Sequence, residues 1–170
     1  MATYPFPVAD GGPPASVHAE RTILGAMLVD SVAIVDATMR LREDDFSLDS
    51  HRRIYTAMAR LAEVGHAVDI ITVSEELRKK KELDSIGGVA YLATLSEGIP
   101  QKPSIESYTA IVKDKSLLRK LMTVCDSGMI EAADQSREAL DVLNEVTARI
   151  IEISEHAISK SFSSIAADLI

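Results

Sequence analysis

The stretch that decides the fold is residues 108–129, which read YTAIVKDKSLLRKLMTVCDSGM. One set of positions in it recurs at alternating spacings of three and four residues, which is the period of a packed helical seam. These positions are Tyr108, Ile111, Lys115, Leu118, Met122, Cys125 and Met129. Pro103 suits a helix start, because its missing N–H costs nothing there. The pattern therefore predicts a long helix over 103–129, which would extend for roughly 40 Å.

A second run with the same spacing follows and ends near Ser159. Its positions are Leu143, Val146, Ile150, Ile153 and Ala157. Together the two runs predict an antiparallel helical hairpin with its turn at residues 133–136. Leu140, Ile151 and Ile158 widen the apolar face of the second helix beyond one seam. This surplus of apolar surface needs a second surface to cover it.

Two interpretations of the hairpin remain open on the pattern alone. It is either an assembly element that pairs with another surface, such as a second copy, or an ordinary two-helix part of one bundle. We favour assembly. The residues predicted to make the self-association contact are Leu118, Met122, Val146, Ile150 and Ile153.

The chain before the hairpin predicts a compact helical head, so the expected fold class is all-α. Residues 1–15 are rich in proline and glycine, which is typical of a disordered tail. Serines at 161, 163 and 164 indicate a hinge, and the apolar stripe after them breaks off at the last residue. We therefore expect the natural chain to continue. The predicted divisions are a tail over 1–15, the head over 16–101, the hairpin over 102–159 and the start of a linker helix over 160–170.

Helix starts in the head are predicted at polar residues whose side chains can accept a backbone N–H. The candidates are Ser16, Asp30 or Ser31, and Asp49 or Ser50. Thr72 and Glu75 have the spacing of a capping box, which predicts a short helix from Thr72 to near Lys81. Gly65 is the predicted stop of the helix before it.

Composition excludes several classes of protein. The formal net charge is −8 and the sequence pI is near 5.0, which argues against nucleic acid as the main partner. The start of the chain lacks the features of a signal peptide, and no apolar run approaches membrane-spanning length. We therefore expect a soluble cytoplasmic protein without membrane contact. The single cysteine, Cys125, excludes an internal disulfide and is expected to pack as a small hydrophobe on the seam.

The sequence contains few candidates for a catalytic, cofactor-binding or metal site. No phosphate-binding glycine loop occurs, so no catalytic residue, cofactor site or metal site is predicted in these 170 residues. The four histidines show no metal-ligand spacing; His18 is expected at the surface, and His51 at a helix start. The acidic run 43–45 is interpreted as a solvated helix boundary. The cationic run 78–81 is interpreted as a complement to a helix C-terminus, with a contact to an acidic partner as the alternative.

From Ser16 onward, five ordered phrases resemble the N-terminal domain of the bacterial replicative DNA helicase, the DnaB family. They are ASVHAE (15–20) with ILGAML (23–28); DDF (44–46) with HRRI (51–54) and Met58; VDIIT (68–72) with Leu77; LDSIGG (83–88) with AYL (90–92) and Leu95; and Tyr108 with Ile111, Val112 and 119–121. Any one phrase is weak, but the ordered set covers residues 15–158 and is specific.

The resemblance implies a helical head and a hairpin through which such domains pair, forming a collar of three dimers on a hexamer. It also implies two partners, the primase and a helicase loader. The parent protein would be an ATP-dependent 5′-to-3′ DNA helicase whose ATP and Mg are held by a RecA-like motor absent from this sequence. We therefore expect a non-catalytic fragment that binds little nucleic acid itself.

Two other functions stay open as alternatives. The helicase-interaction domain at the C-terminus of primase has a related fold, although the 68–72 and 83–88 phrases favour the helicase. A small metal-dependent hydrolase that uses the scattered histidines and acids is the less favoured alternative.

Overall fold

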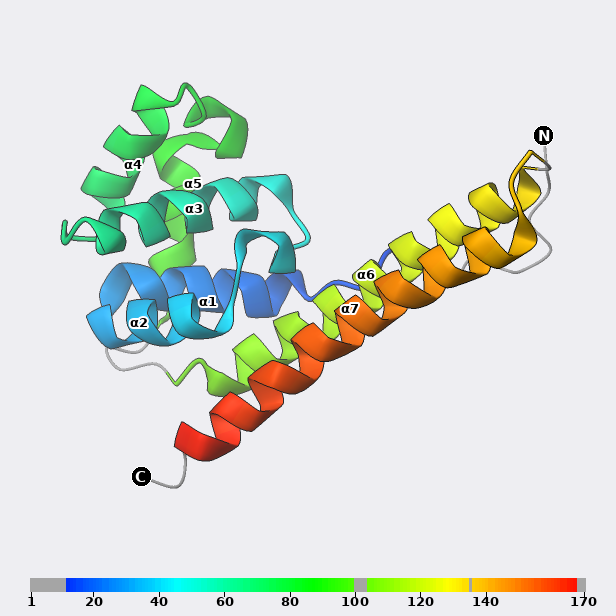
Figure 1. Cartoon of the computed structure of the whole chain (residues 1–170). Helices are drawn as coiled ribbons and strands as arrows, with labels where there is room; N and C mark the ends of the chain where they lie inside the picture. The colour runs from blue at the N-terminus through cyan, green and yellow to red at the C-terminus, as the bar shows by residue number, and fades with distance from the viewer. Residues whose placement is uncertain (1–11, 100–103, 135, 168–170) are drawn as a thin grey trace.

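The computed structural model describes the backbone of residues 12–99, 104–134 and 136–167, and side chains as far as Glu155. In these ranges every regular element is helical, and a head of short helices is followed by a long antiparallel hairpin (Figure 1). The predicted fold class is therefore confirmed. The head contains α1 (Val17–Val29), α2 (Ser31–Arg40), the 3-10 turn η1 (Glu43–Asp45), α3 (Asp49–Glu63), α4 (Ile70–Lys79), the 3-10 turn η2 (Asp84–Ile86) and α5 (Gly88–Ser96). The hairpin consists of α6 (Glu106–Ala133) and α7 (Ala139–Ala167).

Helix α1 is the centre of the head, because it contacts α2, α3, α5 and α6. Ile23, Leu24 and Met27 are completely buried on it. Gly25 allows the closest approach: a Cβ there would lie 2.0 Å from the carbonyl oxygen of Leu95. No side chain fits in that space, so a glycine at position 25 lets α1 and α5 pack backbone against backbone.

The helix caps agree with the sequence in one case and differ in three. Asp30 caps α2 as predicted, since its carboxylate accepts the N–H of Val32 at 3.0 Å. Ser16 occupies the cap position of α1 but its side chain makes no capping hydrogen bond. Asp49 lies inside α3 and binds Arg53 instead.

The third difference is the capping box of α4. The box pairs Asp69 with Thr72, and not Thr72 with Glu75 as predicted. The Asp69 carboxylate accepts the N–H of Thr72 at 2.9 Å, and the Thr72 hydroxyl accepts the N–H of Asp69 at 3.0 Å. The sequence contains two overlapping capping boxes, one over residues 69–72 and one over 72–75. The first one forms, and the helix therefore begins at Ile70.

Each helix of the hairpin extends beyond its predicted C-terminal end. Helix α6 runs from Glu106 to Ala133, beyond the expected end at Met129. It begins later than predicted, because residues 104 and 105 are not helical, and Pro103 lies outside the described residues. Helix α7 continues without a break through 161–164 to Ala167, where a hinge after Ser159 was expected. The turn falls between Ala133 and Ala139, which agrees with the prediction.

The seam predicted on α6 is not its buried face. The buried residues of α6 are Thr109, Val112, Ser116 and Val124. Met122 and Val124 are separated by about 200° around the helix, so Met122 faces away from the packed side. Tyr108, at the start of the predicted seam, does pack against the core of the head. The contact between the two helices instead uses Gly128, because a Cβ at this position would lie 3.0 Å from a methyl group of Val146.

Ion pairs join the hairpin to the head. Lys113 binds Asp45, whose side chain is only 1 % exposed, and Arg119 donates to the carbonyl oxygens of Pro14 at 2.7 Å and Asp45 at 2.5 Å. Lys120 binds Asp44 at 2.6 Å. Burial raises the pKa of Asp44, but the Lys120 ammonium outweighs this effect and holds that pKa below its usual value. Glu43 and Asp44 are exposed, as expected, but Asp45 is buried, and Asp44 and Asp45 anchor α6.

Candidate functional site

The five residues predicted to mediate self-association differ in their exposure. Leu118, Met122 and Ile150 are exposed at 38 %, 42 % and 39 %. Val146 and Ile153 are half-buried, and Val146 packs on α6 at Gly128. Their role in association remains a prediction. Of the five, only Leu118, Met122 and Ile150 are more than one-third exposed.

The exposed apolar surface of the hairpin extends well beyond those three residues. Large apolar side chains more than one-third exposed occur along both helices: Ile111, Leu117, Leu118, Leu121, Met122, Met129 and Ile130 on α6, and Leu140, Leu143, Ile150 and Ile151 on α7. Exposed apolar surface of this extent is typical of an interaction site. We define the row Ile111, Leu118, Met122 and Met129 as the apolar stripe of α6.

Cys125 lies on the same side of α6 as this stripe and is exposed. The expectation that it packs as a small hydrophobe is therefore wrong within a single chain. The reason is the same as for its neighbours: α7 covers the side of α6 that contains Val124, and not the side that contains Cys125.

A buried polar network lies at the centre of the head, and the sequence did not predict it. His51 lies in the first turn of α3, as expected, and it is completely buried. Its Nδ1 lies 2.6 Å from a carboxylate oxygen of Glu20, and its Nε2 lies 2.7 Å from the hydroxyl of Tyr91. The other Glu20 oxygen accepts the N–H of Ser47 at 2.8 Å. The network thus ties α1, the segment before α3, α3 itself and α5 together.

The network is built for stability and not for chemistry. Burial raises the pKa of Glu20, but its hydrogen bonds to His51 and Ser47 outweigh this effect and lower the pKa below its usual value. Burial also raises the pKa of Tyr91. Glu20 and His51 are sealed from solvent at 1 % and 0 % exposure, so no substrate can reach them. Glu20, His51 and Tyr91 all lie inside the sequence phrases that resemble the family. That resemblance is the sequence feature that could have pointed to this network.

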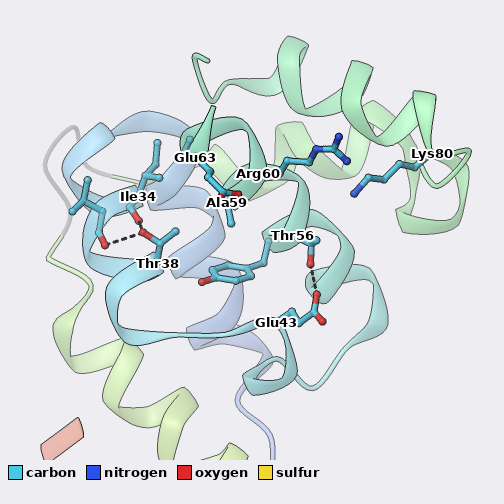
Figure 2. A pocket seen from close by; sticks show the side chains of 11 residues that line it. Ile34, Thr38, Glu43, Thr56, Ala59, Arg60, Glu63 and Lys80 are labelled. Carbon is cyan, nitrogen blue, oxygen red and sulfur yellow. Dashed lines mark hydrogen bonds between the residues drawn. The ribbon is translucent and has the colours of Figure 1, made fainter. Parts of the chain in front are cut away.

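An open groove of about 750 Å³ separates α2 from α3 on the head (Figure 2). Its apolar lining includes Ile34, Val35 and Ala59. Burial raises the pKa of Tyr55, which also lines it, to about 12, and the Tyr55 hydroxyl donates to the carbonyl oxygen of Leu41. The charged residues of its lining are Glu43, Arg60, Glu63 and Lys80.

The remaining candidates give no further site. His18 and His66 are exposed, and the side chain of His156 lies outside the described residues. Within the described part of the chain, no three His, Cys, Asp or Glu side chains come together as a metal site. The same residues contain no helix long and apolar enough to cross a membrane. The cationic run 78–81 lies at the end of α4, as expected, and Lys81 has a φ of 60° in the turn that follows.

Comparisons with known proteins agree on one family. The family model described as DnaB-like helicase N terminal domain matches residues 12–114. The chain is 37 % identical over 153 residues to "Replicative DNA helicase DnaB" of Geobacillus stearothermophilus, covering 90 % of this chain and 34 % of that protein. It is 33 % identical over 153 residues to "Replicative DNA helicase DnaC" of Bacillus subtilis, with the same coverage. The chain thus spans about a third of the length of these relatives.

Solved structures agree with the sequence comparison. The crystal structure of the N-terminal domain of DnaB helicase from Mycobacterium tuberculosis matches with a TM-score of 0.78 at 32 % identity, covering 82 % of this chain and 99 % of that one. A structure of a DnaB-like replicative helicase, described together with its interactions with primase, matches with a TM-score of 0.65 at 20 % identity. That match covers 88 % of this chain and 35 % of the other, and it bears on the fold alone.

Proposed function

Because this chain belongs to the DnaB-like helicase N-terminal domain family, we propose that it is the assembly and partner-docking domain of a hexameric replicative DNA helicase. The parent protein would use ATP and Mg, held outside these 170 residues, to unwind DNA in the 5′-to-3′ direction in the cytoplasm. The chain itself would contribute no catalytic residue. Identity of 37 % to a replicative helicase over 90 % of this chain supports the proposal.

The observation that carries the assembly role is the apolar stripe of α6. Ile111, Leu118, Met122 and Met129 are each about 40 % exposed, although they lie on a helix of 28 residues that is packed on its other side. When a helix has apolar residues on two opposite faces and its own chain covers one of them, we expect the other face to pack against another molecule. Pairing of two copies through this face would produce dimers, and three such dimers would form the collar.

The partners proposed for the collar are the primase and a helicase loader. A structural relative is described with its interactions with primase, and the same role is proposed here. An all-helical head that is stiffened by buried polar contacts suits a docking platform, because little order is lost when a partner binds. The alternative, a domain of primase itself, is not favoured, since the relatives named above are helicases.

Light scattering tests the proposal directly. We expect the molar mass of this chain to rise from monomer to dimer or hexamer across a concentration series. Ile150→Asp should shift the transition to higher concentration, because a charge would be buried at the interface. Ile71→Asp is the matched control, since Ile71 is 74 % exposed on α4 of the head. A monomer at every concentration, for the unmodified chain, would contradict the assembly role.

A further inference from the structure

The segment before α1 is fastened to the hairpin before it enters the head. Arg119 of α6 donates to the carbonyl oxygen of Pro14 at 2.7 Å and, through its other terminal nitrogen, to that of Asp45 at 2.5 Å. Pro14 is half-buried, so the last part of the tail predicted over 1–15 is held against α6. Figure 1 shows that this segment, drawn in blue, approaches α1 from the side of the hairpin tip. Residues 1–11 lie outside the described part of the chain.

The side of α6 that contains Arg119 has an apolar surface between this residue and the tip. At about 100° per residue, Met122 and Ile130 lie about 60° and 20° from Arg119 around the helix. Met129 lies about 80° from it. Gly128, the residue that contacts α7, lies about 180° away, so α7 leaves this side of the helix open. Met122, Met129 and Ile130 are exposed at 42 %, 44 % and 67 %, and we define these three residues as the anchor-side patch.

Residues 4–8, which read YPFPV, have the composition to cover this patch. They contain no charge, and they hold two aromatic side chains in a chain that is only 4 % aromatic. Pro5 and Pro7 keep the residues before them extended, so little backbone freedom is lost when the segment binds. Methionine thioethers make favourable contacts with aromatic rings, and Met122 and Met129 supply two of them. The segment and the patch therefore complement each other chemically.

The length of the tether matches the distance to the patch. Ile130 follows Arg119 by 11 residues, which is about 17 Å along α6. Residues 4–8 precede Pro14 by six to ten residues, which span about 12–19 Å as a flexible chain and at most about 31 Å when extended. Gly12 has a φ of 69°, so the chain bends there and stays short of the extended limit. A short tether of this kind keeps the segment near the patch at an effective concentration on the order of millimolar.

We propose that residues 4–8 bind the anchor-side patch of α6 in their own chain, with their aromatic rings against its methionines. Because Met122 and Met129 also belong to the apolar stripe of α6, the bound segment competes with a second copy for these two residues. The contact itself goes beyond the proposed assembly function, and only the competition rests on that function. The segment is thus a competitor built into the chain, and it raises the concentration at which two copies pair.

The rate at which an internal disulfide forms tests the contact. In a Cys125→Ser background, Ala9→Cys places a thiol next to the segment, and Asp126→Cys places one between the residues of the patch. Neither position belongs to the proposed contact, and Asp126 is exposed, so circular dichroism should match that of the unmodified chain. The matched control adds Tyr4→Ser and Phe6→Ser, which remove the aromatic rings and keep the tether length. Both chains are oxidised with copper phenanthroline in air, and non-reducing electrophoresis separates internal disulfides from linked dimers.

We expect the internal disulfide to form at least about fivefold faster with the native segment than with the serine control, because binding raises the effective thiol concentration. Replacing the patch with Met129→Gln and Ile130→Gln should slow the reaction to the same extent. Equal rates in all three chains overturn the contact, since the tether alone would then explain them. Linked dimers in place of internal disulfides also overturn it, because the segment would then bind a second copy.

Light scattering on chains without the added cysteines tests the competition. Tyr4→Ser with Phe6→Ser should lower the concentration of half-association by about fivefold or more, because only chains with an uncovered patch are competent to pair. Equal concentrations of half-association for the two chains overturn the competition. A monomer at every concentration contradicts the proposed assembly function, whereas the disulfide rates decide the contact of the segment independently of assembly.

Discussion

Replacing Glu20 with alanine removes the carboxylate that joins α1 to α3 and to the segment before α3. Two donors then lose their acceptor in a sealed interior: the N–H of Ser47, at 2.8 Å, and Nδ1 of His51, at 2.6 Å. Each buried donor left unpaired costs about 1–3 kcal/mol. Breaking one partner of a buried pair costs about 3–5 kcal/mol in other proteins. We therefore expect Glu20→Ala to lower the free energy of unfolding by about 3–5 kcal/mol.

Urea unfolding followed by circular dichroism at a fixed low protein concentration measures this loss. In thermal unfolding the same loss should lower Tm by about 6–20 °C, at about 2–4 °C per kcal/mol for a chain of this size. Glu63→Ala is the control, because Glu63 is an exposed glutamate on α3. A Glu20→Ala variant within about 1 kcal/mol of the unmodified chain would refute the reasoning, since that is the scale of an ordinary surface change.

The pH dependence of the same difference gives an independent check. Burial raises the pKa of Glu20, but hydrogen bonds from His51 and Ser47 lower it overall, so its folded pKa lies below the unfolded one. The contribution of the carboxylate is therefore complete above the unfolded value of about 4.3 and is lost as pH falls through the folded pKa. The difference between Glu20→Ala and the unmodified chain should be constant from neutral pH to about pH 5.5 and should shrink below about pH 4. A difference that grows on acidification would contradict this sign.

Three further perturbations follow from the structure. Urea unfolding should show that Gly25→Ala lowers the free energy of unfolding by more than about 3 kcal/mol, because the new Cβ would lie 2.0 Å from the carbonyl oxygen of Leu95. A loss below about 1 kcal/mol would contradict the close packing of α1 on α5. Ile150→Asp should leave the Tm of the monomer within a few degrees of the original and weaken self-association in sedimentation velocity; intact oligomers with a lowered Tm would show that Ile150 packs within its own chain. Asp45→Asn should speed hydrogen exchange in the first turns of α6, because it removes the charge that holds Lys113 to the head; unchanged exchange there would show that apolar contacts alone fix the junction.

Much of the fold was predictable from local sequence rules. The hairpin followed from its three-and-four spacing, and the end of α3 followed from Gly65. Gly65 has a φ of 72°, a conformation that glycine adopts without strain. Asp30 was found as a cap because an acceptor side chain and a helix start are adjacent in sequence.

The failures share one physical cause, which is that spacing does not reveal which face another element covers. The seam through Met122 has the correct period, but α7 packs on the side of Val124. Asp45 looked like one of three solvated acids, and only the three-dimensional position of Lys113 shows that it is buried. The partners of His51 lie 31 and 40 residues away, so no local pattern could join them.

The self-association residues Leu118, Met122, Val146, Ile150 and Ile153 remain a prediction, and the structure narrows it. It leaves three of them facing outward and turns Val146 toward Gly128. Period alone could not separate these two groups, because a stripe that packs within a chain and one that packs between chains have the same spacing.

The unbroken length of the hairpin gives it the mechanics of a lever. Its fulcrum is the junction where Lys113, Arg119 and Lys120 bind the turn at 44–45, in the first half of a helix of 28 residues. A tilt of about 10° at that fulcrum would carry the far tip through about 4 Å, because the arm from there to Ala133 is about 24 Å long. Since α7 continues to Ala167 on the fulcrum side, its end would be displaced together with the tip. Small movements of the head would thus be amplified at the tip, and load applied to either end of α7 would act on the same ion pairs.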